Sequence, residues 1–230
     1  MITEEIKEKI ERIVNVFETG ATEGKYGALV KLKDYNDPET KTRIVQITFG
    51  RSQTTEFGNL KALIGKYIAA GGAHAATLSP YANRIGKKPS LSTDKLFCDT
   101  LQLAGRTDPV MRKCQDDFFD SFYYLPAIGW FKQMGFTLPL SLLVIYDSHI
   151  HSGSILGFLR ERFAESPPVK GGDEKTWIAQ YVRARHHWLE THSNQILRNT
   201  VYRTQCFKDQ IKANNWDLEQ PVKAHGVTVA

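Results

Sequence analysis

The chain has 230 residues, of which 41% are hydrophobic and 24% are charged. This balance is typical of a folded globular protein and excludes a largely disordered chain. The net charge of +5 at pH 7 favours an anionic partner, such as an anionic glycan. Lysines and arginines are spread along the sequence and not clustered, so we expect no nucleic-acid-binding surface.

The three cysteines, Cys98, Cys114 and Cys206, show no CxxC spacing, and we expect buried free thiols. The longest apolar run, residues 136–146, contains Pro139 and is too short to cross a bilayer, so we expect no membrane span. The first residues are polar and lead directly into a helix, without the features of a secretory signal. Either the protein is made without an export signal, or the signal is absent from this sequence.

The first predicted helix covers residues 3–17, where apolar residues recur at helical spacing and end at Phe17. Thr19-Gly20 supplies its stop. Glu18 therefore lies on the last turn, where we expect it to hold its proton more tightly than in water, as a general acid does. Taken alone, the position is more typical of an ordinary solvated glutamate, because most glutamates are exposed.

A β-hairpin is predicted next. Residues 26–34 and 42–50 alternate apolar and polar side chains, and residues 36–41 have the composition of a turn. Asp34 ends the first strand and Asp37 lies in the turn. A polar run then extends from Arg51 to Glu56, and it is either a sugar-binding segment or a solvated loop.

The rest of the chain is predicted to be mainly helical, with helices at 60–70, 93–104, 108–120, 139–151, 173–192 and 194–213 and an extended tail from residue 214. The helix at 139–151 is almost entirely apolar, so it is central, and its Asp147 needs a cationic partner. Arg185 lies on an otherwise apolar stripe of a later helix. His149 and His151 are two residues apart and do not share a helical face, and no other ligands stand at a matching spacing, so we expect no metal site. No cofactor is implied either. The aromatic residues at 120–135 are more typical of core packing than of sugar stacking.

Several segments, in order, resemble the chitosanases of glycoside hydrolase family 46. Phe17-Glu18-Thr19 stands where the family's first helix ends in Glu-Asn, and residues 26–34 match the length of the family strand that runs from Tyr to Asp. Ile145-Tyr146-Asp147 with His151 resembles a family helix, and the longest matching run is Gly171-Gly172-Asp173-Glu174-Lys175-Thr176. Asn215-Trp216-Asp217-Leu218 resembles a motif near the family's C-terminus.

The resemblance implies a mainly α (α+β), lysozyme-like, two-lobed fold with one small β-hairpin sheet beside the cleft. Residues 1–230 would form one hydrolase domain, with its cleft formed around residues 17–60 and 139–200. Glu18 would be the general acid and Asp34 the general base, about 6.5–9.5 Å apart as an inverting enzyme requires. Asp147, Arg185 and Arg198 would form a supporting charge network.

The chain departs from the family after Asp34, where residues 35–39 replace a segment whose threonine holds the attacking water. Asp37 and Glu39 are therefore alternative bases, and Glu56 is a further candidate. The residues predicted to bind substrate are Arg51, Thr54, Thr55, Glu56, Tyr146 and His151. The resemblance implies an extracellular endo-acting hydrolase of a polysaccharide. Chitosan is the first expectation, and peptidoglycan hydrolysis or a degenerate glycan-binding protein are the alternatives.

Overall fold

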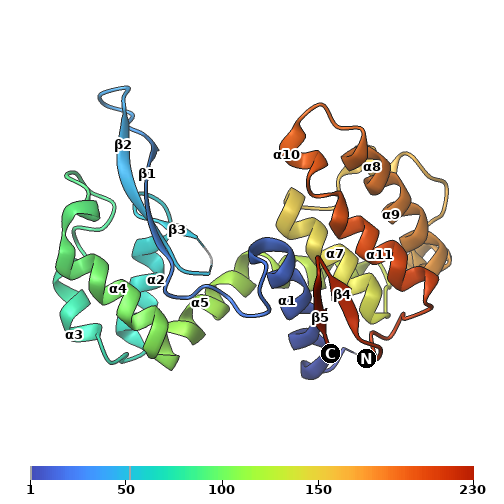
Figure 1. The fold of residues 1–230 in the computed structure, drawn as a ribbon, viewed down its shortest axis with the longest axis horizontal. Helices are drawn as coiled ribbons and strands as arrows, with labels where there is room; N and C mark the ends of the chain where they lie inside the picture. Colours follow the sequence, from blue (N-terminus) through green and yellow to red (C-terminus); the bar gives the residue numbers. More distant parts are fainter. Residues whose placement is uncertain (1, 52) are drawn as a thin grey trace. The chain divides into compact units, whose positions relative to one another are not determined.

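The computed structural model describes residues 2–51 and 53–230, so Ser52 of the predicted polar run lies outside the described residues. The chain divides into two compact units. Unit 1 comprises Met1–Glu23 and Phe122–Ala230, and unit 2 comprises Gly24–Ser121. Figure 1 shows unit 1 in dark blue and in yellow-green to red, and unit 2 in blue to green.

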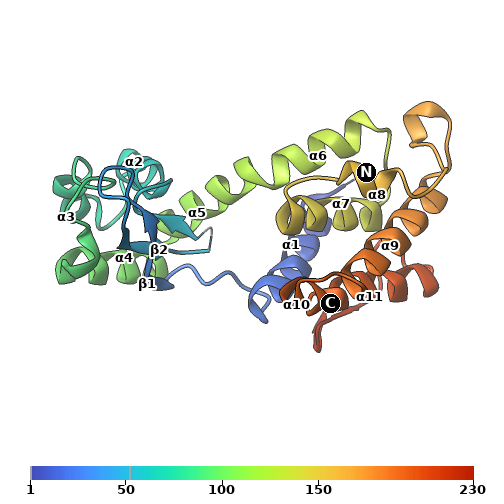
Figure 2. The same cartoon turned by 90° about the horizontal axis from the view of Figure 1, so that it is seen from above.

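Unit 1 is built around helix α7, Pro139–Ser152. Pro139 occupies the first turn of the helix, where a missing N–H costs nothing, and ten consecutive residues from Leu140 to His149 are buried. Helices α1, α6, α9 and α11 all contact α7, and Figure 2 shows α6 running along one side of it. The other elements of unit 1 are α1 Glu4–Thr19, α6 Tyr124–Gln133, α8 Gly157–Arg160, η3 Pro168–Lys170, α9 Glu174–Glu190, α10 Gln195–Arg198, α11 Val201–Lys212, β4 Val222–Ala224 and β5 Val227–Val229.

Local capping chemistry sets both ends of α1. The Thr3 hydroxyl accepts a hydrogen bond from Ile6 N at 3.3 Å, which satisfies one of the free N–H groups at the helix start. Gly20 ends the helix in the left-handed conformation, with φ of 76°, and its N–H bonds to Val16 O. The apolar face from Ile10 to Phe17 is buried. The predicted helix is confirmed, and Glu18 lies on its last turn.

Unit 2 combines a small antiparallel sheet with several helices. The sheet has the order β1-β2-β3, and the side chains of Ile47 and Phe49 on β2 are fully buried in a core with Leu63, Phe97 and Leu101. The elements are β1 Leu29–Asn36, β2 Arg43–Phe49, β3 Thr54–Thr55, α2 Leu60–Ala69, α3 Ala75–Leu78, η1 Ser79–Tyr81, η2 Leu91–Thr93, α4 Lys95–Thr107 and α5 Pro109–Phe122, whose last residue belongs to unit 1. The predicted hairpin is confirmed as β1–β2, and the short strand β3 was not predicted.

The register of β1 against β2 shifts between Leu32 and Tyr35. Leu32 pairs with Gln46, but Tyr35 pairs with Ile44, so β1 carries one more residue than its partner between these positions. Such a bulge bends a strand and re-aims the side chains in it. Asp34 lies in this irregular part of the strand.

One prediction about the C-terminal part of the chain is wrong. The helix predicted over 194–213 is interrupted, because α10 ends at Arg198 and α11 begins at Val201. The extended tail contains a second hairpin, in which Val222 pairs with Val229. The three cysteines are buried and free, as expected. Among the described residues, no helix combines the length and apolarity needed to cross a membrane.

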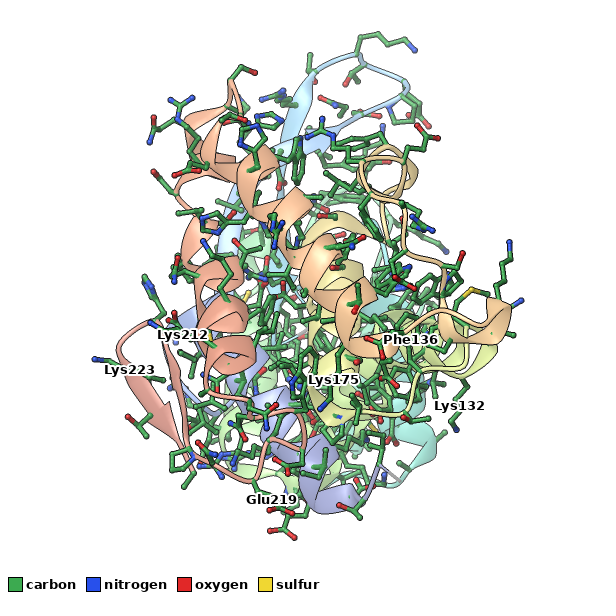
Figure 3. All side chains as sticks on the ribbon, turned by 90° about the vertical axis from the view of Figure 1, so that its right-hand side faces the viewer. Lys132, Phe136, Lys175, Lys212, Glu219 and Lys223 are labelled. Carbon is green, nitrogen blue, oxygen red and sulfur yellow. The ribbon has the colours of Figure 1, made fainter. Side chains whose placement is uncertain are left out.

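Positive charge in unit 1 is distributed over several elements. Figure 3 labels Lys132 on α6, Lys175 on α9, Lys212 on α11 and Lys223 on β4. Lys132 lies on the opposite side of this view from Lys212 and Lys223. The labelled lysines therefore do not form one patch.

Candidate active site

The Glu18 side chain is anchored by a buried charge network drawn from four helices. Its carboxylate pairs with the Arg203 guanidinium of α11. Arg203 Nη1 also donates to Asp147 Oδ1 on α7 at 2.6 Å, and Arg185 Nη1 on α9 donates to Asp147 Oδ2 at 2.7 Å. The network thus runs Glu18–Arg203–Asp147–Arg185. Only Glu18 reaches solvent, with 35% of its side chain exposed against 3% or less for the other three.

Burial and charge act in opposite directions on this network. Burial alone would raise the pKa of Asp147, but Arg203 and Arg185 together hold it below its usual value. Burial alone would lower the pKa of Arg203, and Asp147 and Glu18 raise it instead. The network contains two carboxylates and two guanidinium groups, so it is neutral when Glu18 is ionised.

The second arginine of the network is Arg203, and the prediction of Arg198 is wrong. Arg198 lies on α10, where its Nε donates to Gln195 Oε1 at 3.1 Å and its Nη1 to Ser193 O at 3.1 Å. Its bonds therefore close a local turn. The break between α10 and α11 separates the two arginines onto different helices, so only Arg203 faces Asp147.

His151 lies at the end of α7, beside the network. Burial and the nearby charges of Arg185 and Arg203 lower its pKa to about 4, against a smaller opposing effect of Asp147. Its Nδ1 lies 3.2 Å from the Ser152 hydroxyl. The imidazole is therefore neutral near neutral pH, and it offers one donor and one acceptor nitrogen.

In unit 2, Asp34 projects from the bulge of β1 and is exposed. Gln46 Nε2 donates to Asp34 Oδ1 at 2.8 Å. Among the described residues no second hydrogen-bond partner of this carboxylate is present, so its Oδ2 is available to solvent. An exposed carboxylate with one free oxygen is suited to accept a proton from water.

Comparison with known proteins gives the family. The model of "Glycosyl hydrolase family 46" matches residues 12–222. The chain belongs to glycosyl hydrolase family 46. It is therefore a glycoside hydrolase.

This family 46 chain is 26% identical to a chitosanase of Bacillus subtilis (strain 168), over 94% of this chain and 80% of the relative. A mutant chitosanase of Bacillus subtilis MY002 complexed with 6 GlcN superposes with a TM-score of 0.72 at 24% identity, covering 99% of both chains. A Gynuella sunshinyii chitosanase in complex with chitotetraose gives a TM-score of 0.71 at 21% identity, over 99% of this chain and 98% of the other. The mainly helical, lysozyme-like fold with a small sheet is confirmed.

The two alternative bases of this family 46 hydrolase lie in the hairpin turn. Asp37 accepts bonds from Lys88 Nζ at 2.9 Å, Thr40 Oγ1 at 2.7 Å and Glu39 N at 3.0 Å. These bonds, that of Lys88 above all, lower the pKa of Asp37 to about 2. Glu39 is 77% exposed and pairs with the same Lys88 at 2.5 Å. Both carboxylates thus tie the turn to Lys88.

Several residues predicted to bind substrate are directed inward. Glu56 is completely buried and accepts bonds from Leu91 N at 2.6 Å and Ser90 Oγ at 2.7 Å. Thr54 is 3% exposed, and its hydroxyl donates to Phe49 O at 3.0 Å. The polar atoms of Glu56 and Thr54 are thus engaged in hydrogen bonds inside the protein. The predictions of both residues as sugar ligands are therefore wrong, and so is the prediction of Glu56 as a base.

Arg51 and Tyr146 are also engaged within the protein. Arg51 pairs with Asp116 at 2.5 Å, and 4% of its side chain is exposed. Tyr146 is fully buried, and its ring meets that of Tyr124 edge-on at 5.5 Å. The prediction that these two contact sugar is wrong in this structure. Thr55 on β3 is half-buried and stays a candidate ligand together with His151.

Sequence reasoning missed two residues at the site. Arg203 lies in a segment that was predicted to be helical. The break between α10 and α11 changes which side chains of this segment face α7, so the sequence did not show that Arg203 contacts Asp147. Gln46 carries no charge and belongs to no motif, so the sequence gives no sign of its role. Its position beside the shifted register of β1 is seen only in the structure. Among the described residues, no group of three or more His, Cys, Asp or Glu side chains could hold a metal ion.

Proposed function

We propose that this family 46 hydrolase cleaves internal β-1,4 bonds of chitosan with inversion, and that Glu18 is the general acid and Asp34 the general base. The observation that carries the proposal is the buried network behind Glu18. Burying three charged side chains requires compensation by close pairing, and this network leads to one solvent-exposed carboxylate. The substrate is inferred from the relatives, which are described as chitosanases and include complexes with 6 GlcN and with chitotetraose.

In the proposed reaction Glu18 gives its proton to the glycosidic oxygen as the bond from that oxygen to the anomeric carbon breaks. A water attacks the anomeric carbon from the opposite face, and its proton passes to the Asp34 carboxylate. The product is a hemiacetal of inverted configuration, and solvent returns the proton from Asp34 to Glu18. Arg203 supports the first transfer because its charge stabilises the carboxylate that Glu18 becomes.

Asp34 is preferred over Asp37 and Glu39 as the base because of its contacts. Efficient proton acceptance requires a pKa near the working pH, and the pKa of about 2 at Asp37 makes that carboxylate a weak base. Glu39 shares the Lys88 ammonium with Asp37. The bond that Asp34 accepts comes from a neutral amide.

The proposed substrate is a long polymer, and we propose that the enzyme acts on it outside the cell.

Four variants test the assignments with a chitosan hexamer as substrate. We expect Glu18→Gln and Asp34→Asn each to lower kcat by about 10²–10⁴-fold, the typical range for losing one proton-transfer group. Glu8→Gln, on the exposed face of the same helix, and Asp37→Asn are the matched controls and should keep most of the activity. NMR of the first product should show the α-anomer. Full activity of Glu18→Gln contradicts the acid assignment, and an initial β-anomer contradicts inversion.

The choice of substrate is tested separately, with the unaltered protein. We expect release of glucosamine oligomers from chitosan and no release of muramyl fragments from peptidoglycan. The opposite result would favour a muramidase, and binding of chitosan oligomers without turnover would favour a degenerate hydrolase.

A further inference from the structure

We propose that Gln46 is the positioning residue of the base, and that its neutral amide selects Asp34 over the other carboxylates of the hairpin. The inference rests on the proposed function, in which Asp34 accepts the proton of the attacking water. It starts from the shifted register of β1. Asp34 lies between Leu32 and Tyr35, where the regular pairing of the two strands is lost. A side chain in a bulge is not oriented by the pleat alone, so another group must hold it.

Gln46 is well placed for this role. It is 6% exposed, and both ends of its amide are occupied. Its Oε1 accepts from Phe57 N at 3.3 Å, and its Nε2 donates to Asp34 Oδ1 at 2.8 Å. A backbone N–H can only donate, so the amide oxygen must face Phe57 and the NH₂ group must face the carboxylate. In the reverse orientation, the NH₂ group would face the N–H of Phe57 and the amide oxygen would face the Asp34 carboxylate, so neither hydrogen bond could form.

The segment that orients Gln46 is itself fixed. Glu56 N donates to Ile47 O at 2.8 Å, and the buried Glu56 carboxylate accepts from Leu91 N at 2.6 Å. The Phe57 ring stacks on Tyr35, with ring centroids 4.2 Å apart and planes 14° apart. Glu56, which the sequence suggested as a sugar ligand, thus fixes the backbone next to Phe57, whose N–H orients the Gln46 amide.

The chemical consequence is a difference between two aspartates of one hairpin. Lys88 places a positive charge on Asp37, which stabilises its ionised form and makes it a weak base. Gln46 orients one oxygen of Asp34 without cancelling its charge, and the other oxygen remains available for water. A neutral clamp fixes the geometry of the carboxylate without placing a positive charge beside it, and a general base must be held in reach of its water.

The test uses two variants of Gln46 and one control, with kcat, KM and the pH profile of kcat/KM measured on a chitosan hexamer. Gln46→Met removes both hydrogen bonds, and we expect kcat to fall about tenfold to a hundredfold with KM little changed, as for a misplaced catalytic group. Gln46→Glu keeps the acceptor for Phe57 N but sets a second carboxylate against Asp34. Because like charges disfavour ionisation, the acidic limb of the profile should move to higher pH.

Gln115→Met is the matched control. Gln115 is also a fully buried amide of unit 2, and it joins Tyr26 O at 3.0 Å to Arg51 N at 2.8 Å. Its side-chain amide binds the backbone of Tyr26 and Arg51, so its loss should lower the melting temperature without moving the pH profile. Gln46→Glu keeps the bond to Phe57 N and so remains informative if Gln46→Met fails to fold.

The outcomes separate this inference from the proposed function. If Asp34→Asn is inactive but Gln46→Glu leaves the acidic limb in place and Gln46→Met behaves like Gln115→Met, the role of Gln46 is refuted and Asp34 remains the base. If Asp34→Asn retains full turnover, the assignment of the base is wrong and the role of Gln46 falls with it. A shifted limb in Gln46→Glu together with an inactive Asp34→Asn supports both.

Discussion

Replacing Asp147 with asparagine tests whether the charge network holds unit 1 together. The Asp147 side chain is completely buried and lies between Arg185 and Arg203. Asp147→Asn preserves the shape of the side chain but leaves two buried guanidinium groups facing a neutral amide. The variant therefore isolates charge from packing.

The expected cost follows from the two contacts. Each pair has charge centres about 4 Å apart, which gives about 4 kcal/mol of attraction at an effective dielectric constant of 20. Two pairs give about 8 kcal/mol, and the desolvation of the ions offsets part of it. Removing one partner of a buried pair destabilises by about 3–5 kcal/mol. At about 2–4 °C per kcal/mol for a chain of this size, the melting temperature should fall by roughly 6–20 °C.

The assay is thermal and guanidinium unfolding followed by circular dichroism, and the matched control is Asp117→Asn. Asp117 forms an exposed pair with Lys113 at 3.0 Å, and such pairs contribute about 0–1 kcal/mol. The paired arginines hold the pKa of Asp147 below its usual value, so the stability it confers is present above about pH 4 and is lost at lower pH. The gap between wild type and Asp147→Asn should therefore narrow in acid. A loss below about 1 kcal/mol at pH 7 would refute the reasoning.

Three further changes have defined outcomes. Asp37→Asn should lower stability at neutral pH. Asp37 has a pKa of about 2, so the stability that its ionised form contributes is lost only as the pH falls from about 4 towards 2. Acid unfolding of the wild type and of the variant measures this difference in stability. His151 has a pKa of about 4 in the folded state, so unfolding takes up a proton between about pH 6.5 and 4, and His151→Gln should flatten the decline of melting temperature across that range. Gly50→Ala should cost about 1–3 kcal/mol in denaturant unfolding, since a Cβ there would lie 2.2 Å from Gln115 Oε1 and the residue has a φ of +75°.

The elements that could be predicted from the sequence are those fixed by neighbours in the chain. The end of α1 is set by Gly20, and the start of α9 by Asp173, whose carboxylate accepts from Thr176 N at 2.8 Å. The β1–β2 hairpin follows from alternation and from turn residues. These signals are local, so Glu18 could be placed on its helix turn without a structure.

The parts that could not be predicted depend on contacts between distant segments. The run from Arg51 to Glu56 is polar, and polarity alone predicts exposure. Glu56 instead accepts from Leu91 N, 35 positions away, and Arg51 pairs with Asp116, 65 positions away. The helical pattern through residues 194–213 likewise gives no sign of the break after Arg198. These partners become visible only when the chain is folded.

The supports of the two proposed catalytic carboxylates differ in charge, and the difference follows from their tasks. Glu18 gains negative charge when it protonates the leaving group, so the adjacent Arg203 favours that step. Asp34 loses negative charge when it takes a proton from water, so a cation beside it would oppose the step, and its observed partner is the neutral Gln46. Gln46→Lys should therefore lower kcat further than Gln46→Met, measured on protein shown to be folded by circular dichroism. A lysine variant as active as the methionine variant would mean that the neutrality of Gln46 has no role in the chemistry.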